Sequence, residues 1–419
     1  MPTELTPQKY YRLPWSLTDN GISWLEVTTS CNLACKGCYR PKTEGHKTLK
    51  EIEEDLAVFR KERRSDCMSI AGGDPLVHPR IVDIVRMVKE GGWKPIINTN
   101  GLALTPKRLK ALKAAGAFGF TFHIDVSQAR RDSQGSVESD HNPLRLKFAQ
   151  MLADEGGLTC SFNQTVTSET LDQVPAIVKW AQSYPDIVHT VVFILYREPR
   201  LMGDFDFYAN GEKVDLYSTY EESDAWAGTR ALEAADVVAK IREADPTYEP
   251  SAYLNGTGDA NSVKWLIASR IASRSQSFGY VTPRFMELVQ DGSHLFRKRW
   301  LSYSGPKTLG SGRSAMLASS LFDPGMRAVS KNFLRSIVRK PVSALERSYV
   351  QTVTIIQPVD ALDGGGFNMC DGCPDMTVYK GKMYWSCRLE EVKQFGCFVN
   401  AVPRRQCATV AETAPANPA

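Results

Sequence analysis

Short runs of apolar and β-branched residues alternate with amphipathic stretches through the first half of the chain. Six runs have the length and composition of buried strands, at residues 24–29, 68–71, 95–98, 119–125, 159–166 and 190–196. The stretches between them repeat apolar residues at helical spacing, over residues 49–62, 80–90, 106–115, 144–154 and 168–183. This alternation predicts an α/β fold with a parallel sheet, and it does not distinguish a barrel from an open doubly wound sheet.

Three cysteines follow the first predicted strand, at the end where both arrangements bind ligands. Cys31, Cys35 and Cys38 form a CxxxCxxC loop. Thiolates are the soft ligands that iron–sulfur clusters prefer, and three of them can hold a [4Fe–4S] cluster with one iron left open. A zinc site would need a fourth ligand, for which only His46 lies nearby, and a redox dithiol needs only two cysteines. The spacing therefore favours a cluster.

The second predicted strand ends in a turn that also suits a ligand. Gly72 and Gly73 allow the backbone to approach a ligand closely, and the carboxylate of Asp74 can receive an ammonium group. Together with the cysteine loop, this turn resembles the Gly-Gly-Glu-Pro turn of the radical S-adenosylmethionine (SAM) family. The chain departs from the family in having Asp74 for glutamate, and Gly37 before the third cysteine, where an aromatic residue is usual.

The resemblance implies an incomplete (β/α)6 radical SAM barrel over residues 22–214, after an N-terminal extension over 1–21. It implies that the three cysteines hold a [4Fe–4S] cluster whose open iron binds SAM, and that the turn at Asp74 orients the amino group of SAM. An electron from a donor such as flavodoxin or ferredoxin would then cleave SAM to a 5′-deoxyadenosyl radical, which takes hydrogen from an unactivated carbon. No residue is expected to act as a general acid or base.

Polar residues also occupy the ends of the later predicted strands. Each of them is either a ligand contact or a buried polar group that is satisfied within the protein. The expected cofactor contacts are Tyr39, Gly72, Gly73, Asp74, Asn98, Asn100, His123, Asp125 and Asn163. The expected substrate contacts are Tyr196 and Arg197, which end the sixth strand.

A second group of cysteines lies near the C-terminus, beside a predicted hairpin over residues 378–385. It resembles the auxiliary-cluster (SPASM or twitch) modules of radical SAM enzymes, although the order of the cysteines fits those modules loosely. We predict an auxiliary module over 348–402 and a disordered tail over 403–419. The predicted ligands of a second [4Fe–4S] cluster are Cys370, Cys373, Cys387 and either Cys397 or Cys407, and zinc is the alternative.

The middle of the chain is strongly basic. Residues 264–347 hold 15 Lys or Arg and four Asp or Glu, a net charge of +11, whereas the whole chain carries +4. Basic residues interleaved with apolar ones suit an anionic membrane surface, but a solvated helical face would look the same. No RNA-binding module is recognisable, so no nucleic acid is expected as a partner. We predict a mostly helical insert over 215–347 that covers the open side of the barrel.

The sequence contains neither a secretory signal nor an apolar run of the ~20 residues that cross a membrane. We therefore expect a cytoplasmic enzyme, peripheral at the membrane. Its expected substrate is a hydrophobic or anionic small molecule such as a lipid, modified by C–C bond formation or methylation. The alternatives are a peptide-modifying maturase and a non-catalytic Fe–S or zinc protein that binds membranes.

Overall fold

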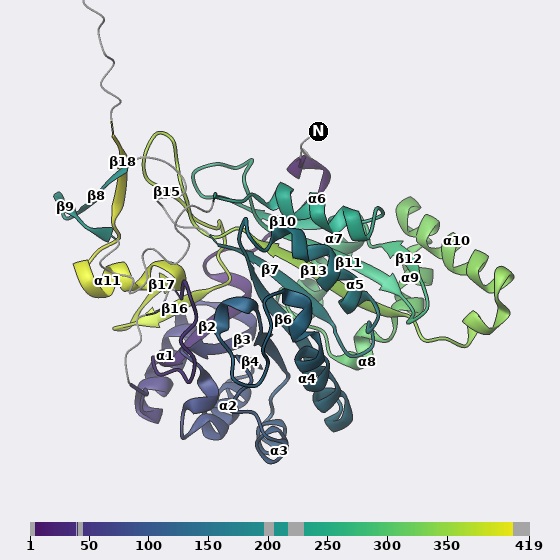
Figure 1. Ribbon diagram of the computed structural model, residues 1–419, viewed down its shortest axis with the longest axis horizontal. Coiled ribbons are helices and arrows are strands. Elements are labelled where there is room, and N and C mark those ends of the chain that lie inside the picture. Colours follow the sequence, from purple (N-terminus) through teal and green to yellow (C-terminus); the bar gives the residue numbers. More distant parts are fainter. Residues whose placement is uncertain (1–4, 39, 41–44, 197–204, 217–229, 405–419) are drawn as a thin grey trace, which may run out of the picture.

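A computed structural model describes residues 5–38, 40, 45–196, 205–216 and 230–404 (Figure 1). The expectations for Tyr39, Arg197, Cys407 and most of the C-terminal tail lie outside the described residues. Among the helices that the structure describes, none combines the length and the apolar composition of a membrane-spanning segment.

Six parallel strands lie side by side in the order of the sequence. They are β2 (Asp19–Thr28), β3 (Arg64–Gly72), β4 (Lys94–Thr99), β5 (Gly119–His123), β6 (Thr159–Val166) and β7 (Thr190–Leu195). The helices between them are α1 (Leu49–Glu62), α2 (Ile81–Glu90), α3 (Pro106–Ala114), α4 (Asn142–Glu155) and α5 (Val174–Gln182). A doubly wound sheet would reverse its strand order at a switch point. The unbroken order therefore confirms the mixed α/β fold with a mostly parallel sheet and favours the barrel type.

The helices pack on one face of this sheet because their apolar residues recur on one side. In α1, Ile52, Leu56 and Phe59 are fully buried, and they belong to the main core together with residues of β2 to β7. The helix begins at a capping box, in which Thr48 and Glu51 each satisfy the other's backbone N–H. Local sequence and tertiary burial thus specify the same helix.

The sheet continues beyond β7 with strands that the sequence did not predict. The added strands are β13 (Tyr349–Ile356), parallel to β7, then β11 (Val263–Ala272), β10 (Ala252–Asn255) and β1 (Tyr11–Arg12), with β12 (Ser277–Tyr280) paired to β11. In the described part of the chain, β1 and β2 form the two outer edges of this sheet, so it does not close on itself. The first strand of the predicted auxiliary module, β13, therefore belongs to the barrel sheet.

The described part of the segment 215–347 contains helices, and it also supplies β10, β11 and β12. Its helices are α6 (Ala234–Ala244), α7 (Pro283–Arg297), α8 (Pro306–Leu309), α9 (Gly312–Ser319) and α10 (Pro324–Arg339). The basic residues of β11 gave the strand a misleading amphipathic pattern. Lys264 is buried in an ion pair with Asp360, and Arg270 is buried against Gln351, so neither faces water.

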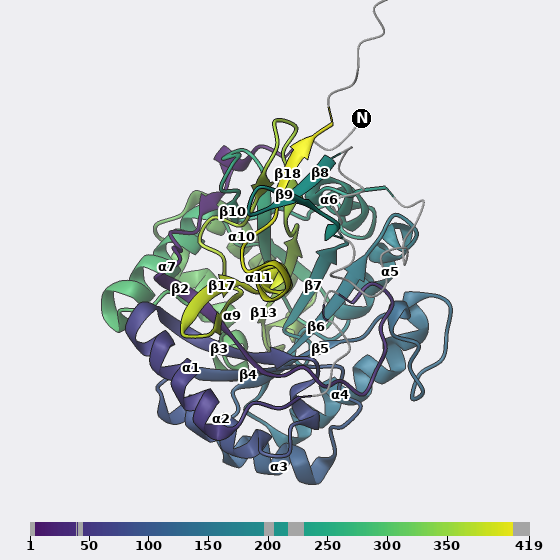
Figure 2. The ribbon, with the colours of Figure 1, turned by 90° about the vertical axis from the view of Figure 1, so that its left-hand side faces the viewer.

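The C-terminal module, not the helical insert, covers the carboxyl ends of the parallel strands. It contains β16 (Met376–Tyr379), β17 (Lys382–Trp385) and α11 (Leu389–Phe395), and Figure 2 shows α11 over the middle of the curved sheet. Small sheets flank it, formed by β8 (Phe205–Ala209) with β9 (Glu212–Val214) and β18 (Asn400–Pro403), and by β14 (Asp360–Ala361) with β15 (Phe367–Asn368). The helices α9 and α10 lie at the opposite end of the molecule (Figure 1). The expectation that the insert covers the site is therefore wrong for these two helices.

Buried side chains of the barrel fix the module in place. The guanidinium of Arg63 donates to the carbonyls of Ile22, at 2.8 Å, and Cys373, at 2.7 Å. The side-chain amide of Asn20 donates to the carbonyl of Gly372 at 2.9 Å. Burial lowers the pKa of Arg63 to about 10, which leaves it charged at neutral pH. Because these donors satisfy carbonyls that the contact buries, the module and β2 form one packed unit.

One buried histidine makes the stability of this fold depend on pH. His189 lies just before β7, and its Nδ1 accepts the N–H of Cys160 at 2.9 Å. Burial lowers the pKa of its imidazole from 6.5 to about 4. Between these values the unfolded chain binds a proton that the folded chain does not, so the stability falls as the pH drops from 6.5 toward 4.

We expect this histidine to cost about 3 kcal/mol of unfolding free energy over that pH range. Denaturant unfolding of the wild type and of His189→Gln, at neutral pH and at the acid end, measures it. The glutamine can still accept the Cys160 N–H but cannot be protonated, so the variant should lose less stability on acidification. Equal losses in the two proteins would contradict the assignment.

Candidate active site

The glycine turn at the end of β3 packs directly on the backbone that leads into the cysteine loop. Gly73 N–H donates to the Thr28 carbonyl at 2.8 Å, and Asp74 N–H donates to the Ser30 carbonyl at 2.9 Å. A Cβ on Gly72 would lie 2.1 Å from the Thr28 oxygen, and one on Gly73 would lie 2.1 Å from the Ser30 oxygen. The close approach that the glycines permit is therefore made to the start of the cysteine loop, where a ligand approach was predicted.

Asp74 connects this turn to the next strand end. Its buried carboxylate accepts the N–H of Leu76 and the N–H of Asn100, each at 2.8 Å, and the hydroxyl of Thr99 at 2.8 and 3.0 Å. Burial raises the pKa of Asp74, while these hydrogen bonds oppose the rise. Its oxygens thus hold the turn after β4, and the expected contact with the amino group of SAM remains a prediction.

Asn100, whose N–H is bound by Asp74, also contacts the cysteine loop. Its side-chain N–H donates to the Asn32 side-chain oxygen at 2.7 Å and lies 3.8 Å from the sulfur of Cys31. The buried guanidinium of Arg130 donates to the Asn100 carbonyl at 2.8 Å. Asn100 was an expected contact, whereas Asn32 and Arg130 were not. Asn32 occupies an unspecified position within the cysteine loop and Arg130 belongs to no motif, so only the folded chain reveals their contacts.

The three cysteines of the loop lie close enough to influence one another. Burial raises the pKa of Cys31, and it raises the pKa of Cys35 to about 12, with the neighbouring thiol of Cys38 adding to the rise in both. Cys31 and Cys38 are exposed, so a ligand can reach their sulfurs. In the part of the chain that the structure describes, no three Cys, His, Asp or Glu side chains converge on a single metal ion. The ligands of a [4Fe–4S] cluster bind separate irons, and three soft donors on one open loop fit that group.

Two other expected contacts, His123 and Asp125, form a pair inside the barrel. His123 Nε2 lies 2.7 Å from the carboxylate of Asp125 and 3.1 Å from the Thr165 hydroxyl. Burial alone would lower the pKa of His123, but the carboxylate raises it, and the same contact outweighs burial to hold the pKa of Asp125 well below its usual range. The N–H of Thr165 also donates to Asp125 at 3.1 Å. Each shift favours the charged form of its group, so this contact favours an internal ion pair.

Asn98 and Asn163 present unpaired polar atoms within the barrel. The Asn98 side-chain nitrogen and the Asn163 side-chain oxygen are both buried and have no hydrogen-bond partner among the described residues. Asn163 lies opposite His123 in the strand register, and Asn98 lies opposite Thr121. Buried polar atoms without partners are costly, and a bound ligand would supply the missing hydrogen bonds.

Tyr196, an expected substrate contact, follows β7, and its N–H donates to the Val166 carbonyl at 2.9 Å.

A cavity of about 280 Å³ lies between the barrel and the C-terminal module. Four charged side chains contribute to its lining: Glu26, Arg40, Glu390 and Lys393. Arg40 pairs with Glu390 at 2.6 Å and also contacts Glu26, and Lys393 pairs with Glu390 at 2.7 Å. Gly72 also lines the cavity, which therefore adjoins the turn that supports the cysteine loop.

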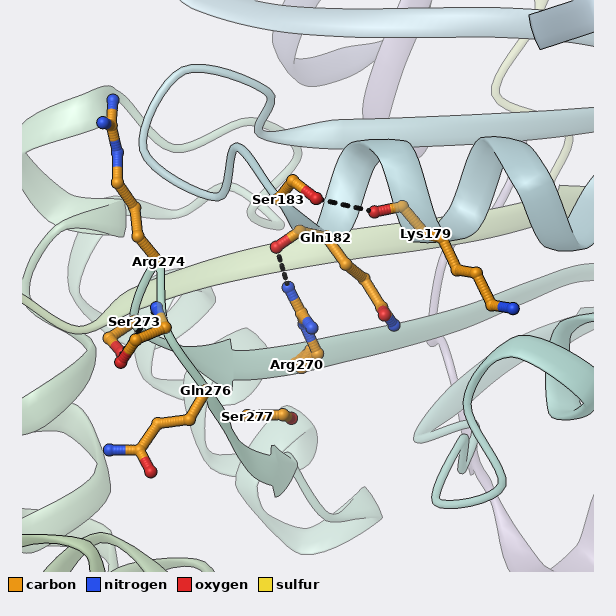
Figure 3. Close-up of a pocket in the computed structure, with 9 residues that line it drawn as sticks. Lys179, Gln182, Ser183, Arg270, Ser273, Arg274, Gln276 and Ser277 are labelled. Carbon is orange, nitrogen blue, oxygen red and sulfur yellow. Dashed lines mark hydrogen bonds between the residues drawn. The ribbon is translucent and has the colours of Figure 1, made fainter.

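A second cavity, of about 210 Å³, lies between the end of α5 and the β11–β12 hairpin (Figure 3). Arg270 donates to the carbonyl of Gln182 at 3.1 Å, and its positive charge thus compensates the negative end of the helix. This cavity adjoins the amino end of β13, because Arg270 lies opposite Gln351 in the sheet. It is therefore not part of the cysteine-loop site.

Three cysteines of the C-terminal module also lie together. A hydrogen bond between Cys370 and Cys373 raises the pKa of Cys373, and burial raises the pKa of Cys387 to about 12, with Cys370 adding to the rise. Burial also raises the pKa of a neighbouring carboxyl, Asp375, to about 6, which the sequence did not single out. Cys397 packs elsewhere, against the apolar cluster of β8 and β18. The structure thus brings together three of the four predicted ligands.

These features define a class: an α/β half-barrel with a three-cysteine loop at its ligand-binding edge and a cysteine-rich module over that edge. Residues 25–181 match the family "Radical SAM superfamily", and this part of the chain is therefore of the radical SAM type.

Individual relatives match over only part of the chain. The tungsten-containing aldehyde ferredoxin oxidoreductase cofactor-modifying protein of Pyrococcus furiosus is 28% identical over 38% of this chain and 47% of its own length. The GTP 3',8-cyclase of Aquifex aeolicus is 29% identical over 44% of this chain and 58% of its own length. The solved structure of Streptococcus suis SuiB bound to S-adenosylmethionine is 15% identical, covering 53% of this chain and 46% of SuiB, at a TM-score of 0.37. The chain spans about half the length of these proteins.

We expect Gly73→Ala to impair binding of the first cluster, because the new Cβ would collide with the backbone before Cys31. Anaerobic reconstitution followed by iron analysis and electron paramagnetic resonance of the reduced protein would measure the loss. Gly364→Ala is the matched control, since a Cβ there meets nothing within 4 Å. Normal cluster content in Gly73→Ala would show that the contact does not position the loop.

Proposed function

We propose that this protein is a radical SAM enzyme that abstracts hydrogen from an unactivated carbon of a small polar substrate. When bound, the cluster and SAM supply one-electron cleavage to a 5′-deoxyadenosyl radical. The observation that carries the proposal is the anchoring of the three-cysteine loop. The glycine turn holds its start, and Asn100, itself held by Asp74 and Arg130, contacts Cys31.

The residues of the barrel would bind and shield the cofactor. Cys31, Cys35 and Cys38 would be the cluster ligands. The unpaired amide atoms of Asn98 and Asn163 would form hydrogen bonds with SAM or substrate. The C-terminal module would exclude water from the strand ends that it covers. A small electron carrier such as flavodoxin or ferredoxin would reduce the cluster.

The cavity under the module favours a polar substrate over the lipid that the composition suggested. Glu26, Arg40, Glu390 and Lys393 contribute charge to its lining, and none of its lining residues is a large apolar side chain. Arg40 already pairs with Glu26 and Glu390, and Lys393 pairs with Glu390, so the lining consists largely of paired charges. A small substrate with hydrogen-bonding groups would fit such a lining better than an acyl chain. The alternatives are a peptide-modifying maturase and a non-catalytic Fe–S or zinc protein that binds membranes. Formation of 5′-deoxyadenosine from SAM would exclude the non-catalytic alternative.

The protein, reconstituted anaerobically with iron and sulfide and reduced with dithionite, should convert SAM to 5′-deoxyadenosine. Chromatography of the products measures this. Cys31→Ala, Cys35→Ala and Cys38→Ala should each abolish the product. A wild-type protein that carries its clusters but never yields 5′-deoxyadenosine would overturn the proposal.

The C-terminal cysteines would bind a separate cluster. Cys373→Ala should reduce the bound iron by about half, because one of two [4Fe–4S] clusters would be lost. Cleavage of SAM in the absence of substrate should continue. Cys397→Ala tests one of the two candidates for the fourth ligand, Cys397 or Cys407, and serves as the comparison, because the structure packs Cys397 against a different cluster. If the C-terminal cysteines bound zinc and not a second set of four irons, the auxiliary cluster would be refuted.

A further inference from the structure

An unusual number of large apolar side chains are exposed around α9 and α10. They are Leu317, Leu321, Phe322, Leu334, Val338, Val342 and Leu345. The exposure is large: 70% for Leu321, 83% for Val338 and 86% for Leu345. Single exposed apolar residues are ordinary, but a group on neighbouring elements marks an interaction surface. We call this surface the α9–α10 face.

The sequence of α10 arranges charge next to these apolar residues. Met326, Val329 and Phe333 face the protein and are buried. Four basic residues recur at every fourth position, which places them in one row along the helix: Arg327, Lys331, Arg335 and Arg339. Leu334 and Val338, also four apart, lie beside that row on the exposed side. The outer side of α10 is thus both cationic and apolar.

Nothing in the described chain neutralises this charge. Residues 311–347 contain seven Lys or Arg and only two acids, Asp323 and Glu346. Asp323 is buried and caps the start of α10, and Glu346 accepts a hydrogen bond from Ser275 at 2.6 Å. Among the described ion pairs, none involves Lys331, Arg335 or Arg339. These cations are therefore available to an anionic partner.

The combination of unpaired cations with exposed aliphatic groups selects among possible partners. A purely solvated face explains the charges but not the aliphatic residues. Two copies of this face would repel each other, because both carry the same charge. Single-stranded nucleic acid would favour aromatic stacking residues, and Phe322 is the only aromatic residue in the exposed group. Anionic lipid headgroups satisfy both features, since aliphatic side chains enter the interface while cations bind phosphate and carboxylate groups.

We propose that the α9–α10 face docks this protein on an anionic membrane surface, with α10 lying along it. Figure 1 places α10 at the far end of the molecule from α11, so docking leaves the charged cavity open to water-soluble partners. The membrane would thus act as a platform and not as the source of the substrate. This inference does not depend on the proposed radical SAM activity.

The test is co-sedimentation of the full-length protein with vesicles of phosphatidylcholine, with or without phosphatidylserine. Binding should need phosphatidylserine and weaken as salt is added. A triple variant, Lys331→Glu, Arg335→Glu and Arg339→Glu, should bind about 100-fold more weakly. A second variant, Leu334→Ser with Val338→Ser, should also bind more weakly, although its charge is unchanged. Both change exposed residues, so circular dichroism and 5′-deoxyadenosine yield should match the wild type.

The matched control reverses three exposed lysines on α3 and α4, Lys107→Glu, Lys110→Glu and Lys147→Glu. It should retain most of the binding. Equal loss in the control would overturn the proposal, because net charge alone would then account for binding. Absence of binding to any vesicle would also overturn it. The same holds for binding to single-stranded RNA that only the glutamate variant loses, and for self-association that the serine variant abolishes.

Discussion

The site depends on a close contact between two backbone segments, the glycine turn after β3 and the strand end that enters the cysteine loop. At Gly72 and Gly73 the two backbone segments are so close that a single added methyl group would overlap a carbonyl oxygen. The contact fixes where the loop starts, and Asn100 then links the loop to the end of β4. Three parallel strands thus hold one loop, and a cluster bound there would sit on rigid supports.

The C-terminal module completes the site through buried charge. Arg63 and Asn20 donate to its backbone, and Arg40 joins Glu26 of the barrel to Glu390 of α11. Such contacts are costly to break, because one lost partner leaves the other buried without compensation. The module is therefore a fixed wall of the cavity in this structure.

The two ends of the molecule have different surface chemistry. The carboxyl ends of the strands carry the cysteines, buried amides and a charged cavity, as parallel α/β folds generally place their ligand sites. The opposite end carries exposed aliphatic groups around α9 and α10, and cations without described ion pairs on α10. The lipid substrate was expected because the basic and apolar composition was attributed to the substrate pocket as well as to the surface. The basic, apolar segment and the charged cavity lie in different places.

The sequence alone determined the six β/α units, the position of the cysteine loop and the glycine turn, because these rest on local periodicity and fixed spacing. It predicted α1 to the residue, since a capping box and three buried positions agree there. Only the tertiary structure decided that β11 and β13 extend the barrel sheet. The basic residues Lys264 and Arg270 make β11 look solvent-exposed in the sequence, but both are buried against partners that are distant in the chain. The same holds for Asn32, Arg130 and the placement of Cys397: each depends on contacts between remote segments, which no local pattern encodes.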